Sequence, residues 1–300
     1  MISSPGSAVF HCKKTPSSSS GDLWNEFFPL IVLKTTRIWR FRDSFCIFSL
    51  TVTIMRYIHI LILLSLFSCG QSQPKAPVSF SSFDTDRIIS HVVDLPHQEL
   101  AFYWRNEKGE NHGNFKKLRS AVEAKGQSLT FAMNGGMYLK DGSPQGLFIQ
   151  HGKRIKAANT RESGYGNFYL QPNGIFFLTT EKKAVITTTA NFKERTDIEF
   201  ATQSGPMLVI DGEMHTAFTN GSKNVHFRNG VGILPDGRLL FAISKEKINF
   251  YDFASFFLKH GCRNALYLDG FVSRMYLSEK DWIQEDGNFG VIIAETSKKQ

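Results

Sequence analysis

Cysteine is scarce in this sequence, which has four among 300 residues. Cys12 and Cys46 lie in an N-terminal stretch that we expect to be separate from the folded domain, and Cys69 is the predicted attachment point for lipid. Cys262 then remains alone in the domain, with no His paired to it at a recognisable spacing. A disulfide framework and a cysteine-based zinc site are therefore excluded.

Long apolar runs are also lacking. The run 58–67 has about half of the ~20 apolar residues that a membrane span requires, and that length is typical of a signal-peptide core. It ends in Leu66-Phe67-Ser68-Cys69, the pattern of a lipobox, which predicts cleavage before Cys69 and its lipidation; a plain signal peptide is the alternative. The absence of Asp directly after Cys69 favours the outer over the inner membrane.

The composition changes along the chain and predicts four parts. We expect residues 1–54 to be a leader outside the mature protein, with Met55 as the true start, and 55–68 to be a lipoprotein signal peptide. Residues 69–86, rich in Ser, Pro and Gln, form a tether, and 87–300 form one globular domain. This organisation places the protein in the cell envelope, anchored to the membrane through lipid.

A strong charge excess is missing as well. The formal net charge is +8 for the whole chain, but residues 69–300 hold 28 basic and 24 acidic side chains, a net charge of +4. A nucleic-acid binder presents a basic stripe, so nucleic acid is excluded as a partner. These 232 residues are enough for one well-buried core.

Periodic apolar positions predict two main helices and about ten strands. Asn114 and Asn249 each precede a helical pattern, which Gly126 and Gly261 end. Turn residues predict a hairpin through Pro96 and others at 211–212 and 235–237. We therefore expect an α+β fold in a single domain, with a mostly antiparallel, strongly curved sheet and too few helices for parallel crossovers.

Polar, glycine-rich clusters follow four of the predicted strands. They are Asn134-Gly135-Gly136-Met137-Tyr138, Gln203-Ser204-Gly205-Pro206, His226-Phe227-Arg228-Asn229-Gly230 and Asp269-Gly270-Phe271-Val272-Ser273. Paired glycines permit positive φ and let backbone amides converge on a ligand, and a guanidinium suits phosphate. Each cluster alone is explained equally well as a turn, a surface cation or a turn-starting Asp; the four together predict a shared site.

The order of these clusters resembles the phosphodiester glycosidase family, which includes the enzyme that uncovers mannose 6-phosphate by removing N-acetylglucosamine. The likeness spans about 130–294 and includes SGPMLVIDG (204–212), RNGVGILPDG (228–237) and NALYLDGFVS (264–273). The last matches the family's DGGGS signature at Asp269, Gly270 and Ser273, whereas Phe271 and Val272 replace two glycines. This departure makes the pocket floor bulkier.

The resemblance implies a hydrolase acting on a phosphate-linked glycan. A phosphate leaving group, with a second pKa of about 6, needs little protonation, so one carboxylate suffices where most glycosidases use two. We predict Asp269 as base or nucleophile, Arg228 as the phosphate ligand, and Asn134, Ser204 and Ser273 as groups that orient oxygens. The predicted binding set is completed by Gly135, Gly136, Gly205, Asn229 and Gly270.

No metal site or cofactor is predicted from the scattered histidines, while a hard cation such as calcium, held by Asp and backbone oxygens, stays open. Two other functions also stay open. One is a non-catalytic glycan-binding or envelope-assembly lipoprotein with the same fold, which the substitutions at Phe271 and Val272 favour. The other, a nuclease-like phosphodiesterase, normally recruits clustered metal ligands, which the sequence lacks.

Overall fold

The computed structural model describes residues 83–299, which belong to one compact unit, Pro77–Gln300. The predicted leader, the signal peptide, Cys69 and most of the tether lie outside the described residues. The last tether residues contact the domain, since Asp84 Oδ1 accepts hydrogen bonds from Ser90 N at 2.8 Å and Ser90 Oγ at 2.9 Å. Within 83–299, no helix has the length and apolarity needed to cross a membrane.

Two α-helices, α2 (Phe115–Glu123) and α3 (Phe250–Lys259), form where the sequence predicts them. Each begins after an asparagine whose side chain caps it: Asn114 Oδ1 accepts from Lys117 N at 2.9 Å, and Asn249 Oδ1 accepts from Asp252 N at 2.8 Å. Capping depends on residues close in sequence, so these boundaries could be predicted locally.

The strands form three sheets, and all strand pairs within residues 83–299 are antiparallel. The first sheet has the order β1 (Ile88–Val93), β12 (Leu239–Ser244), β11 (Asn229–Ile233), β13 (Ala265–Asp269), β9 (Met207–Ile210) and β10 (Glu213–Met214). The second has the order β15 (Trp282–Ile283), β14 (Met275–Leu277), β3 (Gln127–Asn134), β16 (Ile292–Lys298) and β2 (Glu99–Tyr103). The third has the order β5 (Lys153–Lys156), β4 (Phe148–Gln150), β8 (Ile198–Ser204), β6 (Gly174–Thr179) and β7 (Ala184–Thr188).

The antiparallel pairing and the two main helices confirm the prediction, but three sheets replace the one curved sheet that we expected. The hairpins β9–β10 and β11–β12 form at the predicted turns. The hairpin predicted through Pro96 is wrong, because β1 pairs with β12 and β2 pairs with β16. All six residues of β1 are buried, whereas β2 alternates between buried and more exposed positions, so the two strands suit different sheets.

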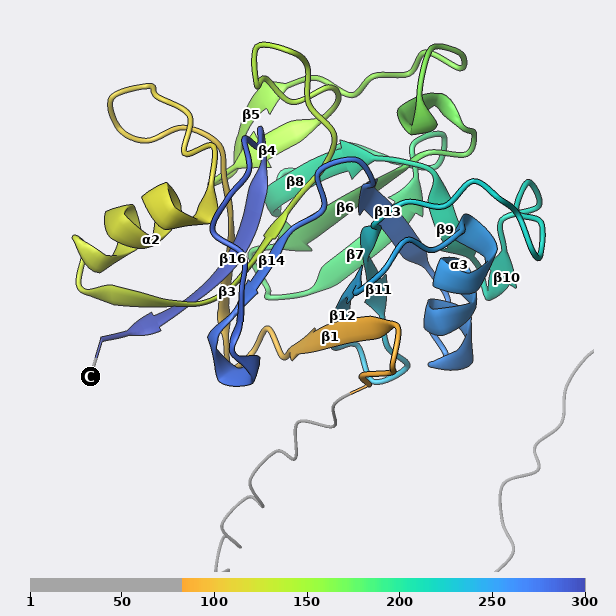
Figure 1. Cartoon of the computed structure of the whole chain (residues 1–300). Helices are drawn as coiled ribbons and strands as arrows, with labels where there is room; N and C mark the ends of the chain where they lie inside the picture. Colours follow the sequence, from red (N-terminus) through yellow and green to blue (C-terminus); the bar gives the residue numbers. More distant parts are fainter. Residues whose placement is uncertain (1–82, 300) are drawn as a thin grey trace, which may run out of the picture. The chain divides into compact units, whose positions relative to one another are not determined.

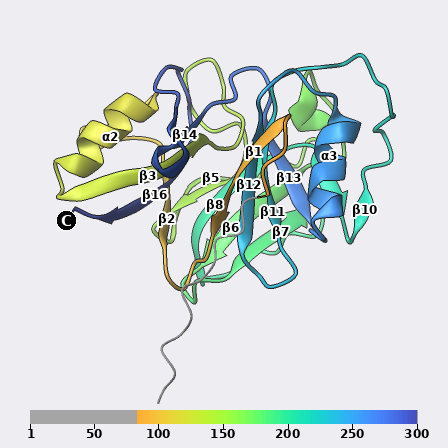
Figure 2. The ribbon, with the colours of Figure 1, turned by 60° about the horizontal axis from the view of Figure 1, so that its bottom comes forward.

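A central apolar core lies between the three sheets, with one helix outside each of two sheets. Phe102, Phe176 and Phe241 contribute to this core from the second, third and first sheets. Helix α2 packs on the outer face of the second sheet, and α3 packs on the outer face of the first. The two helices lie at opposite ends of the fold in both views (Figure 1, Figure 2).

Candidate active site

Strand ends from all three sheets meet at one place. Asn134 ends β3, Ser204 ends β8, and Asn229 and Asp269 lie opposite each other at the ends of β11 and β13. Asn229 Nδ2 donates to Asn134 O at 2.9 Å and to Asn134 Oδ1 at 3.0 Å, and Asp269 N donates to Asn229 Oδ1 at 2.8 Å. Ser204 Oγ donates to Leu268 O at 2.7 Å. The structure therefore brings together residues of the four clusters predicted from the sequence.

Asp269 is the buried carboxylate of this site, with 8% of its surface exposed. Its Oδ1 accepts hydrogen bonds from Gly270 N at 2.6 Å and Phe271 N at 3.2 Å. Burial removes water from the charged form and raises the pKa of Asp269 to about 6, even though the amide bonds act in the opposite direction. The group is thus ionised at neutral pH but takes up a proton in mild acid.

The side-chain amide of Asn134 lies beside the Asp269 carboxylate. Its Oδ1 accepts from Arg274 N at 2.8 Å as well as from Asn229. Its amide lies close enough to Asp269 to lower that residue's pKa, yet the buried Nδ2 makes no hydrogen bond of normal geometry to any residue in 83–299. Buried donors are normally paired, so this N–H group is available to a ligand atom beside Asp269.

Ser273 fixes the loop that follows Asp269. Its Oγ donates to Asp269 O at 2.9 Å and lies 3.3 Å from Phe227 O. Two aromatic side chains flank this loop at the surface, since Phe271 is 90% exposed and Phe227 is 42% exposed. Val272 instead packs against the core cluster under α2. The residues that replace the family glycines therefore have different roles, one exposed and one packed.

The site glycines are required for close packing. None of Gly135, Gly136, Gly205 and Gly270 has positive φ, so that part of the sequence argument is wrong. A Cβ on Gly136 would overlap Thr202 Oγ1 and lie 2.5 Å from the Gln203 carbonyl oxygen, and one on Gly270 would overlap the Tyr267 hydroxyl. A Cβ on Gly135 would lie 2.8 Å from Val291 Cγ1, and one on Gly205 would lie 2.5 Å from Asn173 Cβ.

Arg228 lies next to the site but faces away from the surface, and its side chain is fully buried. Its guanidinium donates to Ile248 O at 2.7 Å, to Tyr267 Oη at 3.2 Å and to Asn224 O at 2.9 Å. Its Cζ lies 3.6 Å from the centre of the Phe250 ring. Burial lowers the pKa of Arg228. In this arrangement the guanidinium holds neighbouring segments together and does not line an open surface.

Two residues of the site, Tyr267 and Arg274, were missed in the sequence, and Tyr138 was named there only as a member of the first cluster. Tyr267 reads as core in the apolar strand 265–269, but its hydroxyl lies between Arg228 and Gly270, and burial raises its pKa. Tyr138 donates to Asn288 O at 2.7 Å, and burial together with the Asp269 charge raises its pKa to about 12. Arg274 directly follows Ser273, and that position was its only signal.

Metal ligands are not gathered in the described part of the chain, where no group of three or more His, Cys, Asp or Glu side chains is arranged to hold an ion. Calcium takes six to eight oxygen ligands. The Asp269 carboxylate is instead surrounded by N–H donors, so the residues present do not fit calcium. Cys262 is buried and burial raises the pKa of its thiol to about 12, which does not suit a nucleophile.

Comparison with known proteins assigns the chain to a family. The family model described as phosphodiester glycosidase matches residues 127–294, a range that contains Asn134, Ser204, Asn229 and Asp269. The chain belongs to the phosphodiester glycosidase family. The resemblance inferred from the sequence motifs is thereby confirmed.

The chain also has a curated relative in Escherichia coli K12, the uncharacterized protein YigE. The two are 34% identical over 234 residues, which is 76% of this chain and 87% of YigE. Solved structures that match this chain include a hypothetical protein from Synechocystis, with a TM-score of 0.45 and 11% identity over 72% of this chain and 61% of that one. Another is the zebrafish N-acetylglucosamine-1-phosphodiester alpha-N-acetylglucosaminidase catalytic domain auto-inhibited by pro-peptide, with a TM-score of 0.43 and 14% identity over 69% of this chain and 87% of that one.

Proposed function

We propose that this protein is a hydrolase that cleaves the sugar–phosphate bond of glycosyl phosphodiesters in the bacterial cell envelope. The observation that carries the proposal is Asp269, a single buried carboxylate at a strand end whose pKa is raised to about 6 beside an unpaired amide donor of Asn134. Perturbed carboxylates of this kind are concentrated at functional sites. Membership of the phosphodiester glycosidase family supports the same reaction class.

The chemistry requires little from the protein on the leaving-group side. A phosphate monoester has a second pKa of about 6 and departs without a strong proton donor. Ionised Asp269 acts on the other side of the bond, either as nucleophile at the anomeric carbon or as base for the attacking water. The free Asn134 Nδ2 donates to a substrate oxygen, where a preorganised donor stabilises developing charge.

The phosphate contact that we assigned to Arg228 fits Arg274 better. Arg228 is fully buried, so we propose that it positions the site by fixing Tyr267 and the strand that carries Asn229. The Arg274 side chain is 33% exposed and is held by Asp286, with both of its hydrogen bonds at 2.8 Å. A guanidinium at the surface beside Ser273 can reach a phosphate that the buried one cannot.

The cellular setting is the second part of the proposal. The apolar run 58–67 and the Leu66–Cys69 pattern support lipid attachment at Cys69 and a place at the membrane surface, with the outer membrane favoured. The substrate class is then a phosphate-linked glycan of the envelope, such as an exopolysaccharide or a lipid-linked glycosyl phosphate.

A non-catalytic glycan-binding role is the second candidate. Phe271 replaces a family glycine, and its ring stands 90% exposed directly after the Asp269–Gly270 pair. A bulky ring at this position can obstruct the reacting geometry while retaining contact with a sugar. Turnover distinguishes the two functions, because the binding protein would retain substrate without releasing product.

The test uses the full chain with a panel of glycosyl phosphodiesters, in the presence and absence of a chelator. We expect free sugar and a phosphomonoester, and we expect Asp269→Asn to abolish their release while the circular dichroism spectrum is unchanged. Reaction in ¹⁸O-water identifies the broken bond. Label in the sugar supports C–O cleavage, whereas label in the phosphate, or wild-type binding without turnover, contradicts the proposal.

A further inference from the structure

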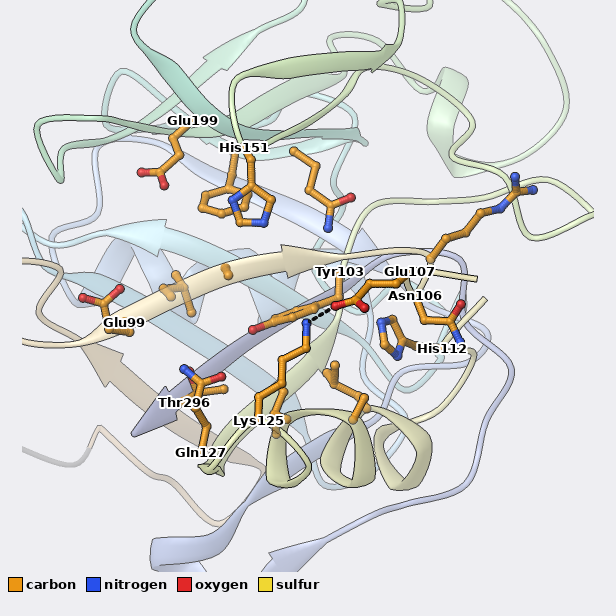
Figure 3. Close-up of a pocket in the computed structure, with 18 of the residues that line it drawn as sticks. Glu99, Tyr103, Asn106, Glu107, His112, Lys125, Gln127, His151, Glu199 and Thr296 are labelled. Carbon is orange, nitrogen blue, oxygen red and sulfur yellow. Dashed lines mark hydrogen bonds and ion pairs between the residues drawn. The ribbon is translucent and has the colours of Figure 1, made fainter. Parts of the chain in front are cut away.

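A cleft of about 970 Å³ lies away from the proposed active site. It is bounded by α2, by the edge strand β2 and by the turn between β4 and β5 (Figure 3). None of the predicted site residues lines it. Its volume is at the upper end of the range for small-molecule sites, about 300–1,000 Å³. The cleft therefore has room for a ligand of its own.

The walls of this cleft are fixed by specific contacts. Gln150 Nε2 donates to Phe102 O at 3.0 Å and so attaches the end of β4 to the free edge of β2. His151 has φ of 50° in that turn, and its imidazole packs edge-on against Phe200 with the ring centres 5.0 Å apart. Figure 3 shows His151 and Glu199 on the opposite side of the cleft from Lys125.

His112 is a largely buried polar side chain that lines the cleft. It is 8% exposed, and its ring packs against Tyr103 with the centres 6.0 Å apart. Neither ring nitrogen is hydrogen-bonded to any residue in 83–299, and the ring lies among the residues lining the cleft (Figure 3). Burial lowers the pKa of His112, so the neutral ring offers one donor and one acceptor.

Acidic and basic side chains line the cleft in equal numbers. The acidic side chains are Glu99, Glu107, Glu110 and Glu199, and the basic ones are Arg105, Lys108, Lys125 and Lys182. Two of the basic residues are paired within the cleft, Lys125 with Glu107 at 2.7 Å and Lys182 with Glu99 at 3.2 Å. The whole chain carries a net charge of +8, yet this cleft has no excess of either sign and gives no preference for an anion or a cation.

We propose that the cleft binds a neutral oligosaccharide of more than one ring. Sugar rings have apolar faces and hydroxyl edges, and the cleft offers matching groups. Its apolar surface comes from partly exposed residues such as Ala101, Tyr103 and Ala121, and its uncharged hydrogen-bonding groups include His112 and Gln127. The site would hold part of a glycan away from Asp269, and it stands independently of the proposed hydrolysis.

Isothermal titration calorimetry of the full chain tests this with uncharged trisaccharides, namely chitotriose, maltotriose and mannotriose. Glucose 1-phosphate and an uncharged extended hexapeptide serve as the anionic and peptide probes. Ala121→Trp fills the cleft from α2, and Lys117→Trp places the same side chain on the same helix but outside the cleft. His112→Gln retains a polar group but alters its geometry.

We expect saturable binding of at least one trisaccharide. Ala121→Trp should weaken that binding by more than about tenfold, or about 1.4 kcal/mol, and His112→Gln should weaken it less. Lys117→Trp and Asp269→Asn should leave it within about twofold, and the second of these separates the cleft from the hydrolytic site. No saturable binding up to millimolar trisaccharide overturns the proposal, as does preferential binding of either other probe or equal effects of the two Trp variants.

Discussion

Replacing Asp269 by Asn should stabilise the folded protein at neutral pH while it removes activity. The carboxyl group has a pKa of about 6 in the fold, against 3.8 for an ordinary Asp. The folded state therefore binds this proton more tightly than the unfolded chain does, and the free energy of unfolding falls as the pH rises from 3.8 to 6. An Asn side chain does not titrate, so the variant escapes this loss.

The size of the effect follows from the two pKa values. A difference of roughly two units corresponds to about 3 kcal/mol, of which about half is lost between pH 5 and pH 8. The Asn Oδ1 can still accept from the amides of Gly270 and Phe271, which now bond to Asp269 Oδ1. Its new N–H group faces the unpaired Asn134 Nδ2, so about 3 kcal/mol is the upper limit of the gain.

Urea unfolding of both proteins at pH 5 and pH 8, followed by tryptophan fluorescence, measures this difference. Titration of the other groups is shared by both proteins and cancels. We expect the wild type to lose about 1.5 kcal/mol more than the variant between these pH values. In parallel, wild-type kcat/KM should fall below about pH 6 because protonated Asp269 is inactive. Identical pH slopes for the two unfolding free energies would show that the carboxyl has an ordinary pKa, and the reasoning would fail.

Three further changes test other parts of the fold. His91 is 6% exposed, its Nε2 lies 2.7 Å from Glu295, and its pKa is raised because two glutamates accept its hydrogen bonds. The stability that this group gives the fold is complete below pH 6.5 and declines as the pH rises through the raised pKa. His91→Gln should therefore lower the free energy of unfolding in urea by about 2 kcal/mol at pH 6 and by less at pH 9, and equal losses would contradict this. Gly270→Ala should lower the free energy of unfolding by about 1–3 kcal/mol, because the new Cβ overlaps the Tyr267 hydroxyl. Adding Tyr267→Phe to this variant should recover part of the lost stability, and no recovery would refute the overlap. Phe271→Gly should change the free energy of unfolding by no more than ~0.5 kcal/mol, because the ring is exposed. The same variant should raise KM for a glycosyl phosphodiester with little change in kcat. A large loss of stability would show that the ring is packed.

The helices and hairpins could be predicted because their signals are local, whereas the division into sheets could not. Strand β8 shows the difficulty. It carries Thr202 and Gln203 in buried positions, so no apolar pattern marks it as a strand. Gln203 Oε1 accepts from Leu147 N at 2.9 Å and Asn159 N at 2.8 Å, bonds to segments 56 and 44 residues away in the chain. Such distant partners make a polar strand stable but leave no trace in the local sequence.

The same limit applies within one cluster, where Asn229 contacts Asp269 and the Arg228 side chain is directed elsewhere. Both stand in one cluster, and the sequence identified that cluster as part of the site. Successive side chains of an extended chain point in opposite directions. Asn229 thus faces Asn134 and Asp269, whereas Arg228 faces the Phe250 ring at the start of α3. A cluster read from sequence predicts where a site lies, and the alternation decides which of its members reach the ligand.

The site also joins the three sheets, which determines what its residues can do for a substrate. The hydroxyl of Ser204 and the amide of Asn229 already donate to groups of other strands. Replacing either one removes a tie between sheets, so a loss of activity in such a variant does not identify a substrate contact. Asn134 Nδ2 differs, because it has no partner among the described residues. Leaving such a donor buried costs about 1–3 kcal/mol, which an oxygen of a substrate beside Asp269 can offset. The Asn134 side chain is also a tie between sheets, because its Oδ1 accepts from Asn229 Nδ2 and Arg274 N, so we expect replacement of Asn134 to lower stability as well as binding.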